Sequence, residues 1–261
     1  MPYALNRHLF PPAVRHLRLA ARDSLTPDSA SADRYVRVRL VEQRPGELAG
    51  FLAPGGGDHV QIVVAPCDGG DVSLDPAGAP LGDARTETVV HHDVEQGYID
   101  LDVLVHGEPG AELGVIGAWA ARAPLGSPAV MKGPKGSVVL SGAPDDVVLA
   151  GDDSALPAVR RYLRMLGPTI TGHLVLETRF DLAVLGIVPP AGMRVSILMP
   201  DAARPSAALV HTLEALPAPV DPLERFVFAC GEQSIVAPVR ALLARWGIDV
   251  ERAVVKGYWK R

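Results

Sequence analysis

The sequence predicts a two-domain protein in which a β-barrel is followed by an α/β domain built on a parallel sheet. In the first half, short alternating segments are separated by Gly, Pro and Asp, as in barrels. After Ser141, continuous apolar strands alternate with helices, which favours a parallel sheet covered on both faces. The 261 residues, 48% of them hydrophobic, suffice for two cores. We expect the domains to span residues 1–141 and 142–261.

The barrel elements follow from period-two alternation of apolar and polar residues. In "RYVRVRLVE", for example, Tyr35, Val36, Val38 and Leu40 stand among arginines. A short helix is expected over Gly114–Ala123, where small apolar residues cluster. Strands are expected over Arg34–Glu42, His59–Pro66, Ala84–Asp93, Tyr98–Gly107 and Met131–Leu140.

The second half has the rhythm of strand and helix in turn. Strands are expected over residues 145–151, 171–178, 193–200 and 225–231. Helices are expected over residues 156–166, 206–216 and 234–247.

Charge and composition exclude several partners. The net charge is −5 with no long run of either sign, which argues against nucleic acid. No apolar run reaches the ~20 residues of a membrane span, and no signal peptide is recognisable, so we expect a cytoplasmic protein. Cys67 and Cys230 lie far apart without a C-x-x-C partner, so neither a disulfide nor a metal site is expected.

The segment "VVLAGDDSALPAVRRYLRML" (Val147–Leu166) predicts a strand, a tight turn and a helix. Such turns lie at the carboxyl ends of parallel strands, where ligands bind. Gly151 allows close approach, Ser154 can cap the helix, and Pro157 suits the first helical turn. Asp152 and its neighbour Asp153 would repel a phosphate. An ordinary structural turn is the alternative.

A second strand end, "FACGEQSIVAPV", repeats this arrangement with Gly231 and Glu232 before a helix. The chain finishes "GYWKR", where Tyr258 and Trp259 can cover a flat ring. The alternative for this aromatic pair is a strand that docks on the sheet.

Together "LAGDDSALPAVRRYL", "FACGEQSIVAPVRALL" and "GYWKR" resemble the landmarks of the siderophore-interacting proteins, which are ferric-siderophore reductases related to the ferredoxin-NADP reductases. The resemblance extends through "RYVRVRL", "AWAARA" and "KGPKGS", so it covers nearly the whole chain from Arg34. It implies a flavin-binding barrel and a nicotinamide-binding α/β domain. In the family, FAD takes hydride from NADPH or NADH and passes electrons to Fe(III), while some members use ferredoxin.

The resemblance also implies the site residues. Thr88, implied near the flavin N5, is one candidate catalytic residue. Glu87, which departs from the family pattern, is the other, because burial in a diverged enzyme could raise its pKa enough for acid or base catalysis. Residues implied at the flavin are Arg85, Thr88, Val105, His106, Gly117, Trp119, Lys135, Gly136 and Ser137. Residues implied at the nicotinamide cofactor are Gly151, Asp152, Ser154, Ala155, Leu156, Pro157, Gly231, Glu232, Tyr258 and Trp259.

Three residues depart from the family pattern at the flavin. In the strand "RTETVV", Glu87 replaces a tyrosine that packs on the flavin ring, and Val90 replaces an arginine that addresses the pyrophosphate. Gly117 replaces a hydroxyl residue. A lost ring stack costs about 1–3 kcal/mol and a lost charged contact about 1.5–3 kcal/mol, so we expect weaker FAD binding.

Two functions from different classes therefore stand. The first is an NAD(P)H- and flavin-dependent oxidoreductase acting on a ferric siderophore or a similar small molecule. The second is a diverged paralogue that has weakened or lost FAD binding and binds or transforms another molecule, as a binding protein or a non-redox enzyme such as a cyclase or isomerase. The sequence leaves open the choice among NADPH, NADH and ferredoxin, the substrate and the oligomeric state.

Overall fold

The computed structural model describes residues 3–26, 34–67, 69–106 and 113–261, so Gly107, at the end of one expected strand, lies outside the described residues. The chain forms two compact units. One spans Arg7–Val138, and the other spans Val139–Arg261 together with the residues up to Asn6. The Tyr3 hydroxyl donates to the carbonyl oxygens of Arg225 and Arg252, each at 2.8 Å. The first residues thus pack with the second unit, whereas the sequence placed them with the barrel.

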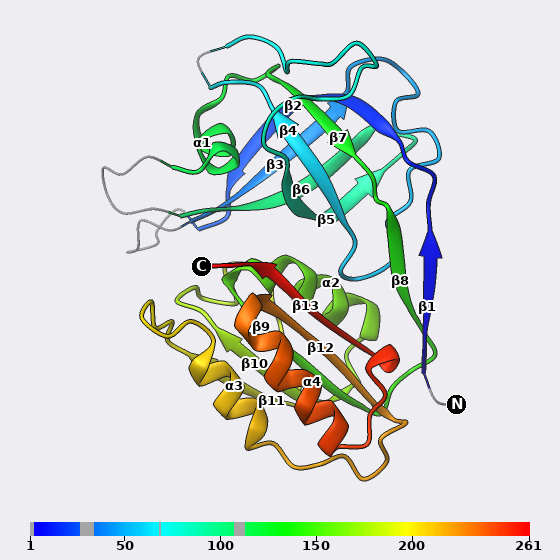
Figure 1. Ribbon diagram of the computed structural model, residues 1–261, viewed down its shortest axis with the longest axis vertical. Coiled ribbons are helices and arrows are strands. Elements are labelled where there is room, and N and C mark those ends of the chain that lie inside the picture. Colours follow the sequence, from blue (N-terminus) through cyan, green and yellow to red (C-terminus); the bar gives the residue numbers. More distant parts are fainter. Residues whose placement is uncertain (1–2, 27–33, 68, 107–112) are drawn as a thin grey trace. The chain divides into compact units, whose positions relative to one another are not determined.

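The first unit is a closed antiparallel barrel, which confirms the expected class of its fold. Its six strands follow the order β2-β3-β6-β5-β4-β7 (Figure 1). Their bounds are β2 Val14–Ser24, β3 Arg34–Glu42, β4 His59–Val64, β5 Arg85–Asp93, β6 Tyr98–Val105 and β7 Pro128–Lys132. The inward residues of these strands pack with Trp119 of helix α1 (Val115–Arg122) into one apolar core.

Two features of this unit differ from the sequence expectation. Strand β2 was not expected, because its arginines obscure the alternation of "VRHLRLA". The single strand expected over Met131–Leu140 is two strands, β7 and β8 (Gly136–Ser141). Gly133 and Pro134 interrupt it, since Gly133 has a positive φ of 97° and proline lacks the N–H of a ladder. Strand β8 pairs with β1 (Ala4–Leu9) in a separate two-stranded sheet.

The second unit is built on a five-stranded parallel sheet, as the alternating pattern predicts. The strand order is β11-β10-β9-β12-β13. The strands are β9 Asp146–Asp152, β10 Thr171–Glu177, β11 Met193–Leu198, β12 Arg225–Glu232 and β13 Ala253–Trp259. Strand β13 contains both terminal aromatics, so the sheet incorporates the end of the chain.

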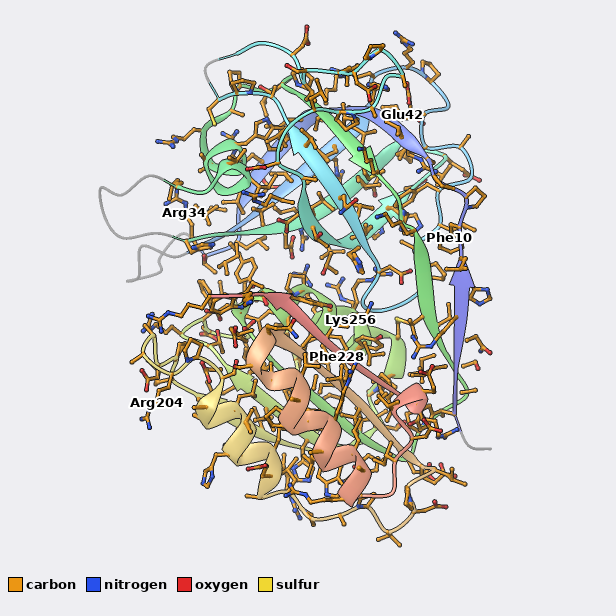
Figure 2. All side chains as sticks on the ribbon, in the orientation of Figure 1. Phe10, Arg34, Glu42, Arg204, Phe228 and Lys256 are labelled. Atoms are coloured by element: carbon orange, nitrogen blue, oxygen red, sulfur yellow. The ribbon has the colours of Figure 1, made fainter. Side chains whose placement is uncertain are left out.

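Helices cover both faces of this sheet (Figure 1). Helices α3 (Ala207–Glu214) and α4 (Val236–Arg245) share one apolar cluster with Val148, Val175 and Val227. Helix α2 (Leu156–Leu166) packs on the other face, where the ring of Tyr162 lies 4.9 Å from that of Phe228. Figure 2 shows Phe228 among the side chains of the sheet.

Strands β9 and β12 end in the same way. Each passes into one 3₁₀ turn, η1 (Asp153–Ala155) or η2 (Gln233–Ile235), and then directly into α2 or α4. Because β9 and β12 are parallel neighbours, both turns lie at the same edge of the sheet. A third such turn, η3 (Val250–Arg252), precedes β13. Within the described residues, no helix is long and apolar enough to cross a membrane.

Candidate cofactor sites

One carboxylate organises the carboxyl edge of the parallel sheet. Asp152 Oδ1 accepts hydrogen bonds from the Ser154 backbone N at 2.9 Å and from the Ser154 hydroxyl at 2.5 Å. Asp152 Oδ2 accepts from the Glu232 backbone N and from Trp259 Nε1, each at 2.8 Å. Asp152 is only 8% exposed; its bond from Glu232 is buried, and the other three bonds are partly buried. The side chain therefore ties together the ends of β9, β12 and β13.

The two turn glycines allow this close approach. A Cβ on Gly151 would lie 2.5 Å from the Ala155 Cβ and 2.6 Å from the Cys230 carbonyl oxygen. A Cβ on Gly231 would lie 2.7 Å from Asp152 Oδ2. All three distances are too short for a larger residue, so packing requires glycine at both positions.

Acidic side chains, not a ligand, cap both turns. Asp152 accepts from the Ser154 backbone N, and Glu232 accepts from the Ser234 backbone N at 2.6 Å. Hydrogen bonds from Ser234 hold the pKa of Glu232 below its ordinary value, so it is ionised at neutral pH. An anion would meet negative charge here and would find these two amides already bonded. The turns therefore suit an uncharged group such as a carboxamide.

Apart from Trp259, the other residues expected at this edge are buried or half-buried. Ala155, Leu156 and Pro157 are buried, so they support the turn through packing. The Tyr258 hydroxyl is hydrogen-bonded to the buried Cys230 thiol, and burial raises the pKa of that thiol to about 12.

Trp259 is 42% exposed, although its indole N–H is bonded to Asp152. One flat face is thereby held in place at the sheet edge. Among the expected residues described here, this is the aromatic surface most open to a ligand.

In the barrel, strand β5 carries the candidate catalytic residues. Glu87 pairs with Val60 of β4 and lies two residues before Val89, and both valines belong to the core. The Glu87 carboxyl group therefore leaves the inward, apolar face of its strand. Burial raises the pKa of Glu87 to about 8, while the nearby Arg85 opposes the shift. Thr88 points to the other face of the strand and is only 7% exposed.

The structure brings two other expected residues, Gly117 and Val105, into contact. Gly117 of α1 packs against Val105, since a Cβ on Gly117 would lie 3.6 Å from the Val105 Cα. That is an ordinary contact distance, so packing does not require glycine at this position. Trp119, two residues further along α1, is fully buried, and its indole N–H has no partner within the described residues. His106 is exposed at the end of β6.

Two of the "KGPKGS" residues, Gly136 and Ser137, make contacts within the protein that hold the local backbone in place. The Ser137 hydroxyl donates to Asp58 Oδ2 at 2.7 Å and accepts from the Gly55 backbone N at 3.1 Å. A Cβ on Gly136 would lie 2.5 Å from the His8 carbonyl oxygen, so glycine is required there. Lys135 is exposed.

The sequence reasoning missed Asp58, which is buried and connects Ser137 to the turn before β4. Its carbonyl oxygen also accepts from the Val89 backbone N at 3.1 Å, next to Thr88. A signal was present, because an aspartate directly after "GGG" is typical of a side chain that bonds back into a turn. The structure thereby links the β5 residues to Ser137.

The barrel residues fit the flavin that the resemblance implies, with fewer contacts than the family pattern. Arg85 and Lys135 keep exposed cationic groups that can meet phosphate oxygens. At neutral pH, a Glu87 with a pKa of about 8 is largely protonated, so the inward face of β5 carries little charge. Val90 is only 6% exposed and offers no hydrogen bond. Two cationic groups thus stay exposed at the barrel, while Glu87 and Val90 offer neither an aromatic ring nor a guanidinium.

Two protein-family models match the two halves of the chain separately. Residues 28–138 match the siderophore-interacting FAD-binding domain, and residues 144–261 match the siderophore-interacting protein family. The ferric vibriobactin reductase ViuB of Vibrio cholerae is 29% identical over 238 residues, which cover 87% of this chain and 84% of ViuB.

Solved structures agree in fold. A siderophore utilization protein from T. fusca superposes with a TM-score of 0.76 at 26% identity, covering 99% of this chain and 96% of that protein. The ferredoxin-NADP+ reductase of Plasmodium falciparum (H286L mutant) has a TM-score of 0.66 at 12% identity, covering 94% of this chain and 96% of the reductase. The barrel and the parallel sheet thus form a ferredoxin-reductase-like fold, and the chain belongs to the siderophore-interacting protein family.

Proposed function

We propose that this protein is a reductase that uses NAD(P)H and FAD to reduce the iron of a ferric siderophore or a similar ferric chelate. The observation that carries the proposal is the edge built around Asp152. There, two glycine turns and an exposed indole meet at the carboxyl ends of parallel strands. In open α/β sheets this edge is where nucleotide cofactors bind.

At this edge the protein's own residues would bind and orient the nicotinamide. The self-capped turns after Gly151 and Gly231 suit the uncharged carboxamide, and the Trp259 indole offers a flat surface for the ring. The Ser154 hydroxyl group donates its one hydrogen bond to Asp152, so the Ser154 oxygen can only accept a hydrogen bond from a ligand. An amide N–H is a suitable donor for it.

In the barrel, Arg85 and Lys135 would hold the FAD phosphates and Thr88 would lie near the flavin N5. FAD supplies the redox chemistry, since it takes a two-electron hydride and delivers single electrons. The overall balance is one NAD(P)H and two Fe(III) giving NAD(P)+, one proton and two Fe(II). A ferric siderophore as the substrate is supported by the ferric vibriobactin reductase of Vibrio cholerae among the relatives.

The test is purification from cells supplied with riboflavin, followed by a visible spectrum and a titration with FAD. We expect saturable FAD binding that is weaker than in relatives with the tyrosine and second arginine. With FAD added, NAD(P)H oxidation should require a ferric chelate and should release Fe(II), detected with a colorimetric Fe(II) chelator. Folded protein that binds FAD and NAD(P)H but releases no Fe(II) from any ferric chelate would contradict the proposed reaction.

One observation favours a second candidate, a diverged paralogue without FAD. Glu87, with a pKa of about 8, is suited to general acid or base catalysis near neutral pH. In that case the barrel would bind another small molecule beside Glu87 in place of the flavin. Failure of folded protein to bind FAD at millimolar concentration would favour this candidate, and stoichiometric FAD would exclude it.

A further inference from the structure

Strand β11 forms a free edge of the parallel sheet, since β10 is its only neighbour among the described strands. The carbonyl oxygen of Leu198 accepts from the backbone N–H of Thr178, directly after β10, at 2.9 Å. Along a parallel strand, the backbone groups of successive residues point alternately to one neighbour and to the other side. The N–H and C=O groups of Val195 and Ile197 therefore point to the open edge.

The side chains along this edge are apolar and exposed. Val195, Ile197 and Met199 are 45%, 47% and 68% exposed. Val195 and Ile197 lie on the face of the sheet opposite to Leu198, which packs with the apolar cluster of α3 and α4. Edge strands are usually protected by charges, proline or a bulge. Arg194 is the only charged residue of β11, and the stretch that follows it up to Met199 has no such protection.

The other edge strand, β13, is protected. Its apolar residues Ala253, Val254 and Val255 are buried, and the residue that follows them is the exposed Lys256. A lysine on an edge strand opposes pairing with a further strand, because pairing would desolvate its charge. Of the two edges, β11 is therefore the one that offers an apolar surface to a partner.

Further apolar surface lies in the segment between β10 and β11. Val184 and Val188 are 52% and 74% exposed. Arg160 of α2 donates to the Leu185 carbonyl oxygen at 3.0 Å, so the segment lies on the α2 face of the sheet. This is the face opposite to α3 and α4, and it also carries the exposed side chains of β11.

The area of this surface is near what a dimer needs. The exposed parts of the five apolar side chains amount to roughly 450–500 Å² per copy, against about 800 Å² per partner in a standard interface. Backbone atoms of the strand and flanking polar atoms add to the apolar part. An apolar patch of this size on a monomer is often functional.

A second copy of β11 matches the edge in an antiparallel arrangement with a two-fold axis at Ser196. Val195 then pairs with Ile197 of the second copy, the reverse pair follows by symmetry, and each pair exchanges two N–H···O bonds. These apolar side chains all lie on one face of the joined sheet. Arg194 faces Leu198 of the second copy, so no like charges are opposed. Helix α3 packs mainly against β10 and α4, so it does not cover the edge.

We propose that two copies of this chain form a two-fold symmetric dimer through antiparallel pairing of their β11 strands. The pairing satisfies the edge groups and buries the apolar side chains of both copies. Because the same surface is used on both copies, the contact closes on itself and gives a dimer. The inference does not depend on the proposed reductase activity, since β11 carries none of the residues expected at a cofactor.

The experiment is analytical ultracentrifugation of the full chain over a concentration series. We expect a dimer with a dissociation constant of roughly micromolar magnitude. In Ile197→Lys, dimerisation should weaken at least about tenfold, because pairing would bury the new charge against an apolar side chain. Val250→Lys is the matched control, since Val250 is 42% exposed and precedes the opposite edge strand β13. Circular dichroism verifies that both variants are folded.

Two results would overturn the dimer. One is a chain that stays monomeric at every concentration, and the other is an Ile197→Lys variant that dimerises as tightly as Val250→Lys. Hydrogen exchange distinguishes the remaining occupant. A monomer whose Val195 and Ile197 amides are protected from exchange would show that another segment of the same chain covers the edge.

Disulfide cross-linking tests the register. In a Cys67→Ser background, Ser196→Cys should give a covalent dimer on oxidation. Directly opposed residues that are not hydrogen-bonded have Cα atoms about 4.5 Å apart, which is within the range of disulfides. Arg194→Cys, on the same face of the strand, is the control and should not cross-link. A dimer that cross-links through Arg194→Cys and not through Ser196→Cys would overturn the proposed pairing.

Discussion

Replacing Asp152 by alanine removes the acceptor of four hydrogen bonds and should destabilise the parallel-sheet unit. The Glu232 N–H is buried and would lose its partner, which costs about 1–3 kcal/mol. The Trp259 indole is partly exposed and can turn to water, and the two Ser154 donors are near the surface, so they add less. Because hydrogen bonds that share one acceptor are not additive, we expect a total of about 3–4 kcal/mol.

The assay is urea unfolding followed by circular dichroism and tryptophan fluorescence, because two domains can unfold in separate transitions. Asp221→Ala is the control, since Asp221 accepts a single exposed bond from the Leu223 backbone N at 2.8 Å. It should cost no more than about 1 kcal/mol. Trp259→Phe, which removes one donor to Asp152, should fall between the two. If Asp152→Ala is no more destabilising than Asp221→Ala, the reasoning from the four bonds is wrong.

Four further predictions concern three positions, Glu87, Gly151 and Gly117. FAD affinity should fall as pH rises through about 8, because Glu87 then ionises, and Glu87→Gln should abolish this dependence in titrations from pH 6 to 9. Protonated Glu87 should also contribute to the free energy of unfolding. This contribution is complete below about pH 4.5, the ordinary pKa of the group, and is lost as pH rises from there to about 8, which urea midpoints can follow. Gly151→Ala should cost about 3 kcal/mol, because its Cβ would lie 2.5 Å from a side-chain carbon, whereas Gly114→Ala, with nothing within 4 Å, should be nearly neutral. Gly117→Ser should leave the unfolding midpoint unchanged and increase FAD affinity, and a serine that lowers the midpoint would contradict the available space.

Much of the fold was readable because burial repeats with the period of each element. The alternation in "RYVRVRLVE" predicted β3 with its observed bounds. The same reasoning failed for β2, where "VRHLRLAARDS" carries three arginines and only three of its eleven residues are buried. It also failed at Gly133, where one positive φ divides an apparently continuous strand into two. Local pattern thus predicts an element where one face is buried and loses it where the strand is mostly polar.

The sequence predicts which residues lie at the candidate site, but it does not predict which hydrogen bonds they make. Gly151 and Gly231 were expected to allow close approach, and the distances that a Cβ would have show why. Asp152 was expected at the nicotinamide cofactor, but in the structure its carboxylate accepts hydrogen bonds from Glu232 and Trp259. These donors lie 80 and 107 residues further along the chain, so the local sequence does not reveal them.

The sequence by itself determined the class of each unit, the order of most strands and helices, and the positions of the turns that require glycine. These depend on hydrophobic period and backbone freedom, which are properties of neighbouring residues. Tertiary structure alone decided that Asp152 is an acceptor for distant donors, that Glu177 is used as a helix cap, and that burial raises the pKa of Glu87 to about 8. Hydrogen-bond partners and desolvation depend on atoms brought together from remote parts of the chain, so they exist only once it has folded.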